Sequence, residues 1–123
     1  MSPKKVRKIL LIEDEPLIQE IYVRKLEEKG FKVLSVVSAE EAKNILRKEK
    51  FHLIILDILL PKEDGVSFLA KIRKQGNKTP VIILSNLEDD NYRKKAKKLK
   101  VKDYLIKTNY TPAELVELIQ KYL

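Results

Sequence analysis

The chain has 123 residues and no cysteine, which excludes disulfides, thiolate zinc sites and a cysteine nucleophile. Its 26 Lys and Arg residues outnumber its 18 Asp and Glu residues, so acidic partners and nucleic acid both have to be considered. No apolar run approaches the roughly 18 residues of a membrane span, and the N-terminus lacks a signal-peptide pattern. We therefore expect one soluble, cytoplasmic domain over residues 1–123, with a disordered tail at 1–5 and no membrane association.

The first half of the chain alternates between strand and helix patterns. Residues 7–12 predict a buried strand, and residues 15–29 predict a helix that a glycine ends. A strand at 31–36 precedes a helix that begins with the capping-box pair Ser38 and Glu41. The apolar residues at helical spacing are Leu17, Ile18, Ile21, Tyr22 and Leu26 in the first helix, and Ala42, Ile45 and Leu46 in the second.

The third strand is expected at 52–57, where four consecutive apolar residues indicate burial on both faces of a sheet. The Asp64-Gly65 pair begins a third helix, which ends at Gly76. The apolar residues that we expect to face inward from this helix are Val66, Leu69 and Ile72.

The second half continues with a strand at 80–84, a helix at 89–99 and a short strand at 103–106. Thr111, a proline at the first helical position and Glu114 begin the last helix. Repeated strand–helix alternation predicts an α/β fold, a parallel sheet with helices on both faces. The residues expected to face inward are Tyr92, Ala96 and Leu99 in the fourth helix, and Leu115, Ile119 and Tyr122 in the fifth.

Polar residues follow four of the predicted strands directly. Glu13 and Asp14 follow the first strand, Asp57 ends the third, Ser85 follows the fourth and Lys107 follows the fifth. Because the carboxyl ends of parallel strands converge on one crevice, we expect these side chains to meet there. Four of the five residues also have a local interpretation: Glu13 and Asp14 as helix caps, Ser85 as the start of a helix, and Lys107 as a surface charge.

The chemistry of this group points to phosphoryl transfer. A carboxylate such as Asp57 at the end of an apolar strand is costly unless it is paired or bound to a metal. Three neighbouring carboxylates repel one another, and Mg²⁺, with its preference for hard oxygen ligands, resolves the repulsion. A carboxylate nucleophile, a metal, a hydroxyl and an ammonium such as that of Lys107 are what formation of an aspartyl phosphate requires.

The chain resembles the response-regulator receiver domains of bacterial two-component signalling over residues 6–123. The resemblance rests on the segments ILLIEDE at 9–15, DILLP at 57–61 with Asp64-Gly65, and YLIK at 104–107, together with Ser85. It implies a flavodoxin-like, doubly wound, five-stranded parallel sheet with strand order 2-1-3-4-5 and five helices. Either a stand-alone, single-domain receiver or a piece cut from a longer protein is consistent with the sequence.

The resemblance also implies roles for individual residues. Asp57 would be the phosphoacceptor, receiving its phosphoryl group from the phosphohistidine of a sensor histidine kinase or phosphotransfer protein. Mg²⁺ would be held by Asp14, Asp57 and the backbone carbonyl of Leu59, with Glu13 acting through water. The domain would not be an enzyme with a separate substrate, since it catalyses only its own phosphorylation and dephosphorylation. The residues implied at the phosphate are Ser85, as a hydrogen-bond donor, and Lys107, as the ion-pair partner.

The family further implies a switch for protein–protein signalling. Ser85 moves toward the phosphate and Tyr104 turns inward, which changes the surface made by the fourth helix, fifth strand and fifth helix. The thin apolar stripe of the fourth helix suits this role, because a weakly packed helix costs little to shift. A half-buried aromatic residue on an edge strand is the alternative interpretation of Tyr104.

Three positions depart from the family pattern. Thr108 stands where a proline with a cis peptide usually follows the lysine, and Asn86 stands where a small residue is common beside the phosphorylation site. The larger side chain of Asn86 is expected to affect phosphate access or lifetime. Lys100-Val101 replaces a common Gly-Ala pair, so either Lys100 takes a strained left-handed conformation or the helix ends differently.

Two other functions remain as alternatives. A phosphatase similar to haloacid dehalogenases would need an aspartate two residues after the nucleophile, and Leu59 stands there. A phosphorylation-independent interaction module would bind an acidic partner or nucleic acid through a basic stretch, although a solvated helix face is the favoured explanation of that stretch. The basic residues of this stretch are Arg93, Lys94, Lys95, Lys97, Lys98, Lys100 and Lys102.

Overall fold

The computed structural model describes residues 6–86 and 89–123, and it places five parallel strands in one sheet with the order β2-β1-β3-β4-β5. This confirms the predicted α/β, flavodoxin-like fold, whereas the tail expected at 1–5 lies outside the described residues. The strands are β1 (Lys8–Ile12), β2 (Lys32–Val36), β3 (Leu53–Leu56), β4 (Val81–Ser85) and β5 (Asp103–Ile106). The helices are α1 (Pro16–Glu28), α2 (Ala39–Leu46), α3 (Gly65–Lys74), α4 (Asp90–Lys98) and α5 (Pro112–Gln120), with a 3₁₀ turn, η1 (Lys107–Asn109), after β5.

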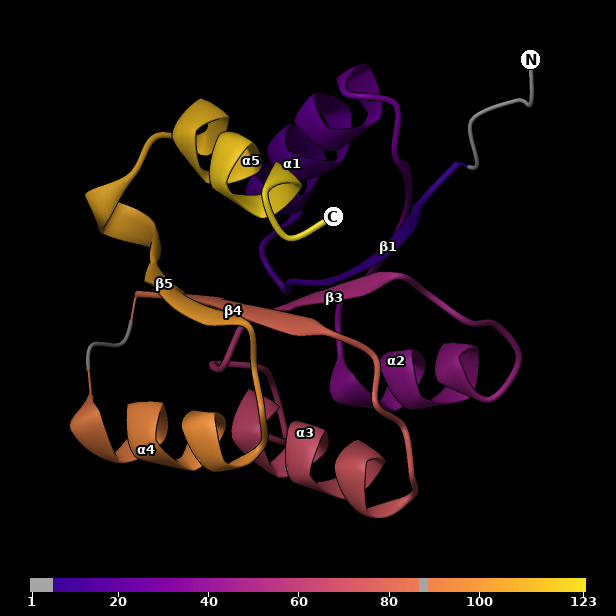
Figure 1. Cartoon of the computed structure of the whole chain (residues 1–123), viewed down its shortest axis with the longest axis vertical. Helices are drawn as coiled ribbons and strands as arrows, with labels where there is room; N and C mark the ends of the chain where they lie inside the picture. The colour runs from indigo at the N-terminus through magenta and orange to yellow at the C-terminus, as the bar shows by residue number, and fades with distance from the viewer. Residues whose placement is uncertain (1–5, 87–88) are drawn as a thin grey trace.

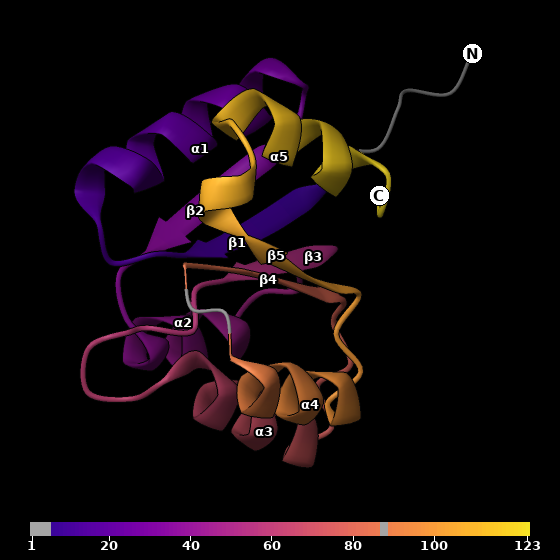
Figure 2. The ribbon, with the colours of Figure 1, turned by 90° about the vertical axis from the view of Figure 1, so that its left-hand side faces the viewer.

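The helices cover both faces of the sheet. Helices α1 and α5 lie on one face, and α2, α3 and α4 lie on the other (Figures 1 and 2). The core divides accordingly, because successive side chains of a strand point to opposite faces. Along β1, Ile9 and Leu11 pack into the cluster beneath α1 and α5, whereas Leu10 and Ile12 pack into the other cluster. No helix within the described ranges has the length and apolar character that crossing a membrane requires.

Side-chain caps fix where several helices begin. At α5 the capping box is complete: the Glu114 N–H donates to Thr111 Oγ1 at 3.2 Å, and the Thr111 N–H donates to Glu114 Oε1 at 2.9 Å. At α2 the Glu41 N–H donates to Ser38 Oγ at 3.2 Å, but the Glu41 carboxylate accepts from the Val37 N–H. The predicted start at Ser38 is therefore confirmed, although only half of the box forms.

The apolar residues of α1 are only partly buried, and the expectation that Tyr122 faces inward is wrong. On α1, Tyr22 and Leu26 are buried, but Leu17 is 76% exposed and Ile21 is 44% exposed, so the buried face is narrower than its apolar pattern. Tyr122 is 38% exposed instead of inward-facing. It lies beyond the end of α5, and its hydroxyl donates to Asp103 Oδ2 at 2.5 Å.

The turn after α4 settles one of the departures from the family pattern. Lys100 has a φ of +61°, so the chain leaves α4 through a left-handed conformation that a glycine adopts without strain. The strained alternative for Lys100 is therefore the correct one.

A second departure, at Thr108, is also resolved: the peptide bond between Lys107 and Thr108 is trans, and the chain continues directly into η1.

Candidate functional site

The sheet brings the predicted site residues to the edge formed by the carboxyl ends of its strands. The backbone N–H of Glu13 donates to Val36 O, and that of Asp57 donates to Ile12 O, both at 3.1 Å. These bonds continue the ladders between β2, β1 and β3, so the positions of both carboxylates are set by the sheet. Ser85, the last residue of β4, is fully buried between them and β5.

Lys107 joins the two buried carboxylates. Its Nζ lies 3.2 Å from Asp57 Oδ2 and also donates a hydrogen bond to Glu13 Oε1. All three side chains are at least nine-tenths removed from solvent. Removing charges from water is costly, and this mutual pairing offsets the cost. The interpretation of Lys107 as a simple surface charge is therefore wrong.

The charges in this group alter one another. Burial, reinforced by the adjacent Asp57 carboxylate, raises the pKa of Glu13 to about 7, against the lowering effect of Lys107. Burial works to lower the pKa of Lys107, but the hydrogen bond to Glu13 and the charge of Asp57 outweigh it, so the pKa is raised. The ammonium form of Lys107 is thus favoured over the neutral amine.

Asp14 completes a set of three carboxylates that fits a divalent cation. One carboxylate oxygen from each of Glu13, Asp14 and Asp57 lies within 4.8 Å of the others, and Asp14 is exposed to solvent. Oxygen donors of this kind, with an open side for water, suit Mg²⁺. Helix capping does not explain the two acids after β1, because Glu15 is the N-cap of α1 and makes no side-chain capping bond.

The loop after β3 fixes the Asp57 carboxylate through a contact that the sequence analysis missed. The Leu59 N–H donates to Asp57 Oδ1 at 3.1 Å, and the Gly65 N–H donates to Ile58 O at 2.7 Å. A Cβ added at Gly65 would lie 2.5 Å from the Asp57 carbonyl oxygen and 2.9 Å from Ile58 Cα. Gly65 therefore serves two purposes: it is the first residue of α3, and its lack of a side chain lets that helix approach the backbone of Asp57 and Ile58.

Tyr104 lies in an inward position on β5 and is 8% exposed. The Arg93 guanidinium of α4 lies over its ring, 4.7 Å from the centroid, at a distance typical of a cation–π contact. Burial raises the pKa of Tyr104, while Arg93 and a hydrogen bond with Ser85 lower it. Ser85 does not begin α4, whose N-cap is Asp89. The residue pair named for the switch is thus in contact, and one residue of the basic stretch packs against it.

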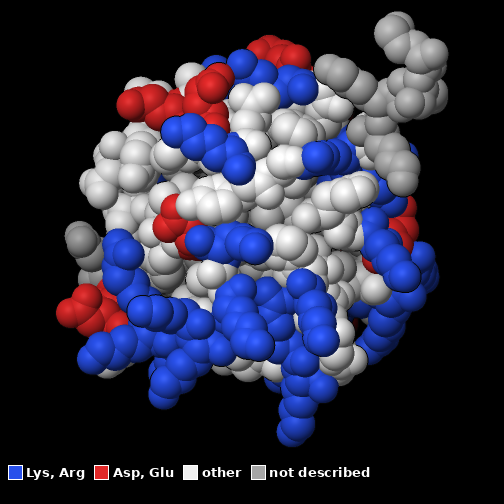
Figure 3. Space-filling view, in the orientation of Figure 1, with Lys and Arg blue, Asp and Glu red and all other residues white. Residues whose placement is uncertain are grey.

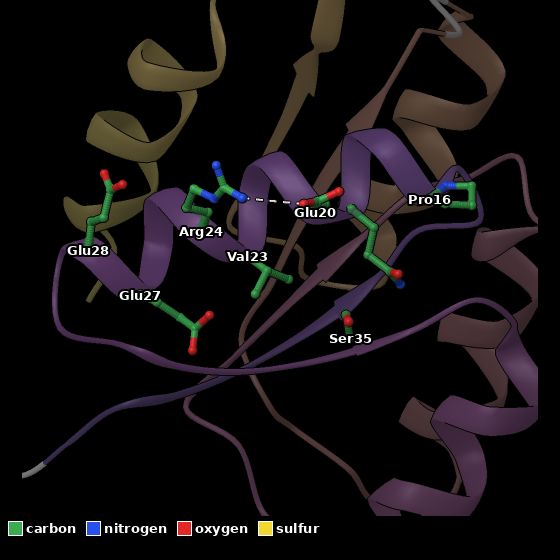
Figure 4. A pocket seen from close by; sticks show the side chains of 8 residues that line it. Pro16, Glu20, Val23, Arg24, Glu27, Glu28 and Ser35 are labelled. Carbon is green, nitrogen blue, oxygen red and sulfur yellow. Dashed lines mark hydrogen bonds and ion pairs between the residues drawn. The ribbon is translucent and has the colours of Figure 1, made fainter.

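Two hollows flank α1. The one beside the site has a volume of about 190 Å³ and is lined by Asn86, Lys107 and Thr108 together with residues of α1, η1 and α5. The other, of about 660 Å³, runs between α1 and the edge strand β2 and contains none of the predicted site residues. Figure 4 shows Val23 and Glu27 pointing from α1 toward β2, while Arg24 and Glu28 point away. The smaller hollow thus contains both Asn86 and Lys107, the lysine that pairs with the two buried carboxylates.

Comparison with known proteins shows the family to which this chain is similar. The family model of the response regulator receiver domain matches residues 9–120. The "Probable transcriptional regulator ycf27" of Porphyridium aerugineum is 35% identical over 94% of this chain and 48% of its own length. This chain spans about half the length of the curated relatives that it matches.

Solved structures agree with this assignment. The receiver domain of the Francisella response regulator 1452 is 30% identical and superposes with a TM-score of 0.85, covering 94% of this chain and 95% of that one. The phosphorylated cyanobacterial phytochrome response regulator RcpA is 26% identical, with a TM-score of 0.82 and coverage of 95% and 91%. With the fold, the acidic site and the family model in agreement, the chain belongs to the response-regulator receiver domains of two-component signalling.

Proposed function

We propose that this receiver domain is phosphorylated on Asp57 by a phosphohistidine of a sensor histidine kinase or phosphotransfer protein. The observation that carries the proposal is the buried Lys107 Nζ, which pairs with Asp57 and Glu13 at the crevice of the sheet. A carboxylate fixed beside an ammonium, with a hydroxyl on the neighbouring strand, has the groups that an in-line phosphoryl transfer uses.

In the proposed reaction a carboxylate oxygen of Asp57 attacks the phosphorus atom of the donor. A P–O bond forms as the P–N bond breaks, and the electron pair returns to the imidazole of the donor, which takes up a proton. Lys107 balances the negative charge of the phosphoryl oxygens, and Ser85 donates a hydrogen bond to one of them. In dephosphorylation water attacks the same phosphorus atom, and the Asp57 carboxylate leaves with inorganic phosphate as the second product.

The site residues also fit the magnesium ion that the family implies. Asp14, Asp57 and the Leu59 carbonyl would hold Mg²⁺, with Glu13 acting through water, and the ion would supply charge neutralisation for the phosphoryl group. Asp14 is suited to the solvent-facing side of such a site because its side chain is exposed and no ion pair engages it among the residues described. Glu13 keeps its bond to Lys107 in this arrangement, since it is not a direct ligand.

An apolar surface beside the site fits a partner helix. Leu17 and Ile21 of α1 are exposed, and Ile21 also lines the hollow that contains Lys107 and Asn86. Exposed apolar side chains next to a reactive group are a common feature of docking surfaces. We assign this surface to the phosphohistidine donor, so that its imidazole is delivered from the α1 side.

The output of the switch would be read on α4, β5 and α5. Arg93 links α4 to the Tyr104 ring, and Tyr104 is linked to Ser85 in turn. A shift of Ser85 toward the phosphate would change this chain of contacts and reposition α4, which buries only Ala96 fully. The domain in this scheme acts on no separate substrate; it catalyses only its own phosphorylation and dephosphorylation.

The test is transfer of label from phosphohistidine. A panel of phosphorylated phosphotransfer domains is mixed with this chain and Mg²⁺, and label on this chain is followed by gel and by its sensitivity to hydroxylamine, which cleaves acyl phosphates. We expect hydroxylamine-sensitive label, which Leu17→Glu slows during transfer from protein donors and leaves unchanged with acetyl phosphate. No label from any donor, with the chain folded, would contradict the proposal.

A further inference from the structure

A basic cleft lies at the end of the sheet opposite to the carboxylate site. The loop between α3 and β4 and the turn between α4 and β5 enclose a cleft of about 400 Å³. Pro80 and Leu99 contribute its apolar surface. Five cationic side chains line the cleft: Arg73, Lys78, Lys98, Lys100 and Lys102.

Arg73 holds the two sides of this cleft together. Its Nε donates to Leu99 O at 3.0 Å, and its Nη1 donates to Asn77 O at 3.0 Å and Thr79 O at 2.7 Å. These acceptors are neutral carbonyl groups, and among residues 6–86 and 89–123 no carboxylate forms an ion pair with the guanidinium. The hydrogen bonds of Arg73 thus fix the backbone on both sides of the cleft, so the cleft is preformed.

In the described part of the chain, the remaining cations of the cleft also form no ion pair. Within residues 6–86 and 89–123, no carboxylate lies within ion-pair distance of Lys78, Lys98, Lys100 or Lys102. The sequence contains no acid between Asp64 and Glu88, and none between Asp90 and Asp103. Clustered like charges repel one another, and an anionic ligand would relieve this repulsion.

Lys100 adds an independent argument. Its backbone has a φ of +61°, a conformation in which glycine is free of strain and a lysine is not. The side chain of Lys100, whose backbone has this unfavourable conformation, lines the cleft and is exposed. The backbone at this position favours glycine, whereas the lysine that stands there gives the cleft one more cation.

The basic surface extends well beyond the cleft. Lys74 at the end of α3 and Lys94 and Lys97 on α4 are exposed, and Figure 3 shows Lys and Arg side chains spread across the part of the molecule where Figure 1 draws α3 and α4. A small phosphorylated molecule would occupy the cleft alone. A ligand that uses the whole surface must be an extended polyanion.

The composition of this surface favours nucleic acid over an acidic protein. Lysine is depleted at protein–protein interfaces, whose central contacts come mainly from Trp, Tyr and Arg. Contacts to a phosphate backbone are made by lysines that act as point charges and require no sequence readout. We propose that the cleft lined by Arg73, Lys78, Lys98, Lys100 and Lys102, with the α4 lysines beside it, binds the phosphate backbone of nucleic acid.

The test compares two triple variants that remove the same charge. Lys78→Gln, Lys98→Gln and Lys102→Gln change the cleft, whereas Lys32→Gln, Lys48→Gln and Lys50→Gln change exposed lysines elsewhere. Both lower the net charge from +8 by three, to +5. Binding of the full chain to a fluorescent, random-sequence DNA duplex is measured by anisotropy between about 50 and 200 mM salt.

We expect the triple variant of the cleft to bind the duplex about tenfold or more weakly than the parent. The plot of log K for binding against log salt concentration should become shallower, its slope decreasing in magnitude by about 2.7 for three lost contacts. The matched variant should stay within about twofold of the parent, because isolated surface charges contribute little. Lys100→Gly, which removes one cleft cation while relieving backbone strain, should lower the slope by about 0.9 and guards against misfolding of the triple variant.

Three results would overturn the proposal. One is equal loss of affinity in both triple variants, which would mean that binding depends only on the overall charge of the protein. Another is no binding of the parent at low salt. The third is displacement of the duplex by polyglutamate at equal or lower concentration of charge, which would indicate an acidic protein partner instead.

Discussion

Lys107 Nζ lies 3.2 Å from Asp57 Oδ2 although the two residues follow strands that are not neighbours in the sheet. Lys107 follows β5, and its side chain passes the end of β4 to reach the residue after β3 and also Glu13 after β1. One ammonium therefore balances two buried carboxylates and couples the ends of three strands. Phosphorylation at Asp57 would place new negative charge where this lysine already binds.

Mg²⁺ should stabilise the fold through the carboxylate cluster. A ligand that binds only the folded state adds about 2.7 kcal/mol at a concentration of one hundred times Kd. We expect a matching rise in the melting temperature of the parent as Mg²⁺ is added, and a much smaller rise for Asp14→Asn, whose exposed side chain can be changed without disturbing the core. Equal shifts in both proteins would mean that the cation binds elsewhere.

Gly65→Ala should damage both stability and phosphorylation. The new methyl group would overlap the Asp57 carbonyl oxygen at 2.5 Å, so α3 or the end of β3 has to move. Overpacking of this kind costs about 1–3 kcal/mol, measured by urea unfolding.

Gly30→Ala is the matched control for this prediction. Gly30 has a φ of +93° but open space around it, so the change introduces backbone strain away from the site. It should lower stability by about 1 kcal/mol and leave the phosphorylation rate per folded molecule unchanged. If Gly65→Ala also leaves that rate unchanged, the contact does not position Asp57.

Lys100→Gly should stabilise the protein by about 1 kcal/mol, because glycine accepts a φ of +61° without strain. Lys97→Gly removes the same side chain from within α4 and should instead destabilise by about 1 kcal/mol. Chemical denaturation of the three proteins side by side separates the two effects. A loss of stability in both variants would show that the Lys100 side chain makes a favourable contact that outweighs its strain.

Asn86→Ala should speed phosphorylation by acetyl phosphate and loss of the phosphoryl group to water. Asn86 is exposed and lines the hollow that also contains Lys107, so a smaller side chain opens access to the site. We expect an increase of about twofold to tenfold, equal to at most about 1.4 kcal/mol in the barrier. Asn109→Ala, an exposed change in η1 outside this hollow, is the control; rates equal to the parent in Asn86→Ala would remove the role assigned to Asn86.

The sequence was sufficient to predict the fold and the meeting of four side chains at one edge of the sheet, because both follow from local patterns. Apolar runs and capping residues define the strands and helices, and the parallel sheet then brings Glu13, Asp57, Ser85 and Lys107 to one edge. These residues are far apart in the chain but share one position relative to their strands. The convergence could therefore be predicted before any contact was known.

What the sequence analysis missed depends on contacts between elements. The need for Gly65 arises from the backbone of Asp57 and Ile58 just after β3. The cleft unites Lys98 of α4 and Lys102 of the following turn with Arg73 of α3 and Lys78 of the loop after α3. Leu17 belongs to the apolar residues at helical spacing in α1, but it is exposed because the neighbours of α1 cover only part of its apolar surface. Hydrophobic spacing shows which residues share a helix face and does not show how wide a face the sheet covers.

Intact mass after incubation with Mg²⁺ and acetyl phosphate tests the central claim most directly. The parent and Asp90→Asn, a matched change at an exposed aspartate on α4, should each gain one phosphoryl group, whereas Asp57→Asn should gain none. A gain in folded Asp57→Asn equal to that of the parent, or no gain in any of the three proteins, would contradict the assignment of Asp57 as the phosphoacceptor.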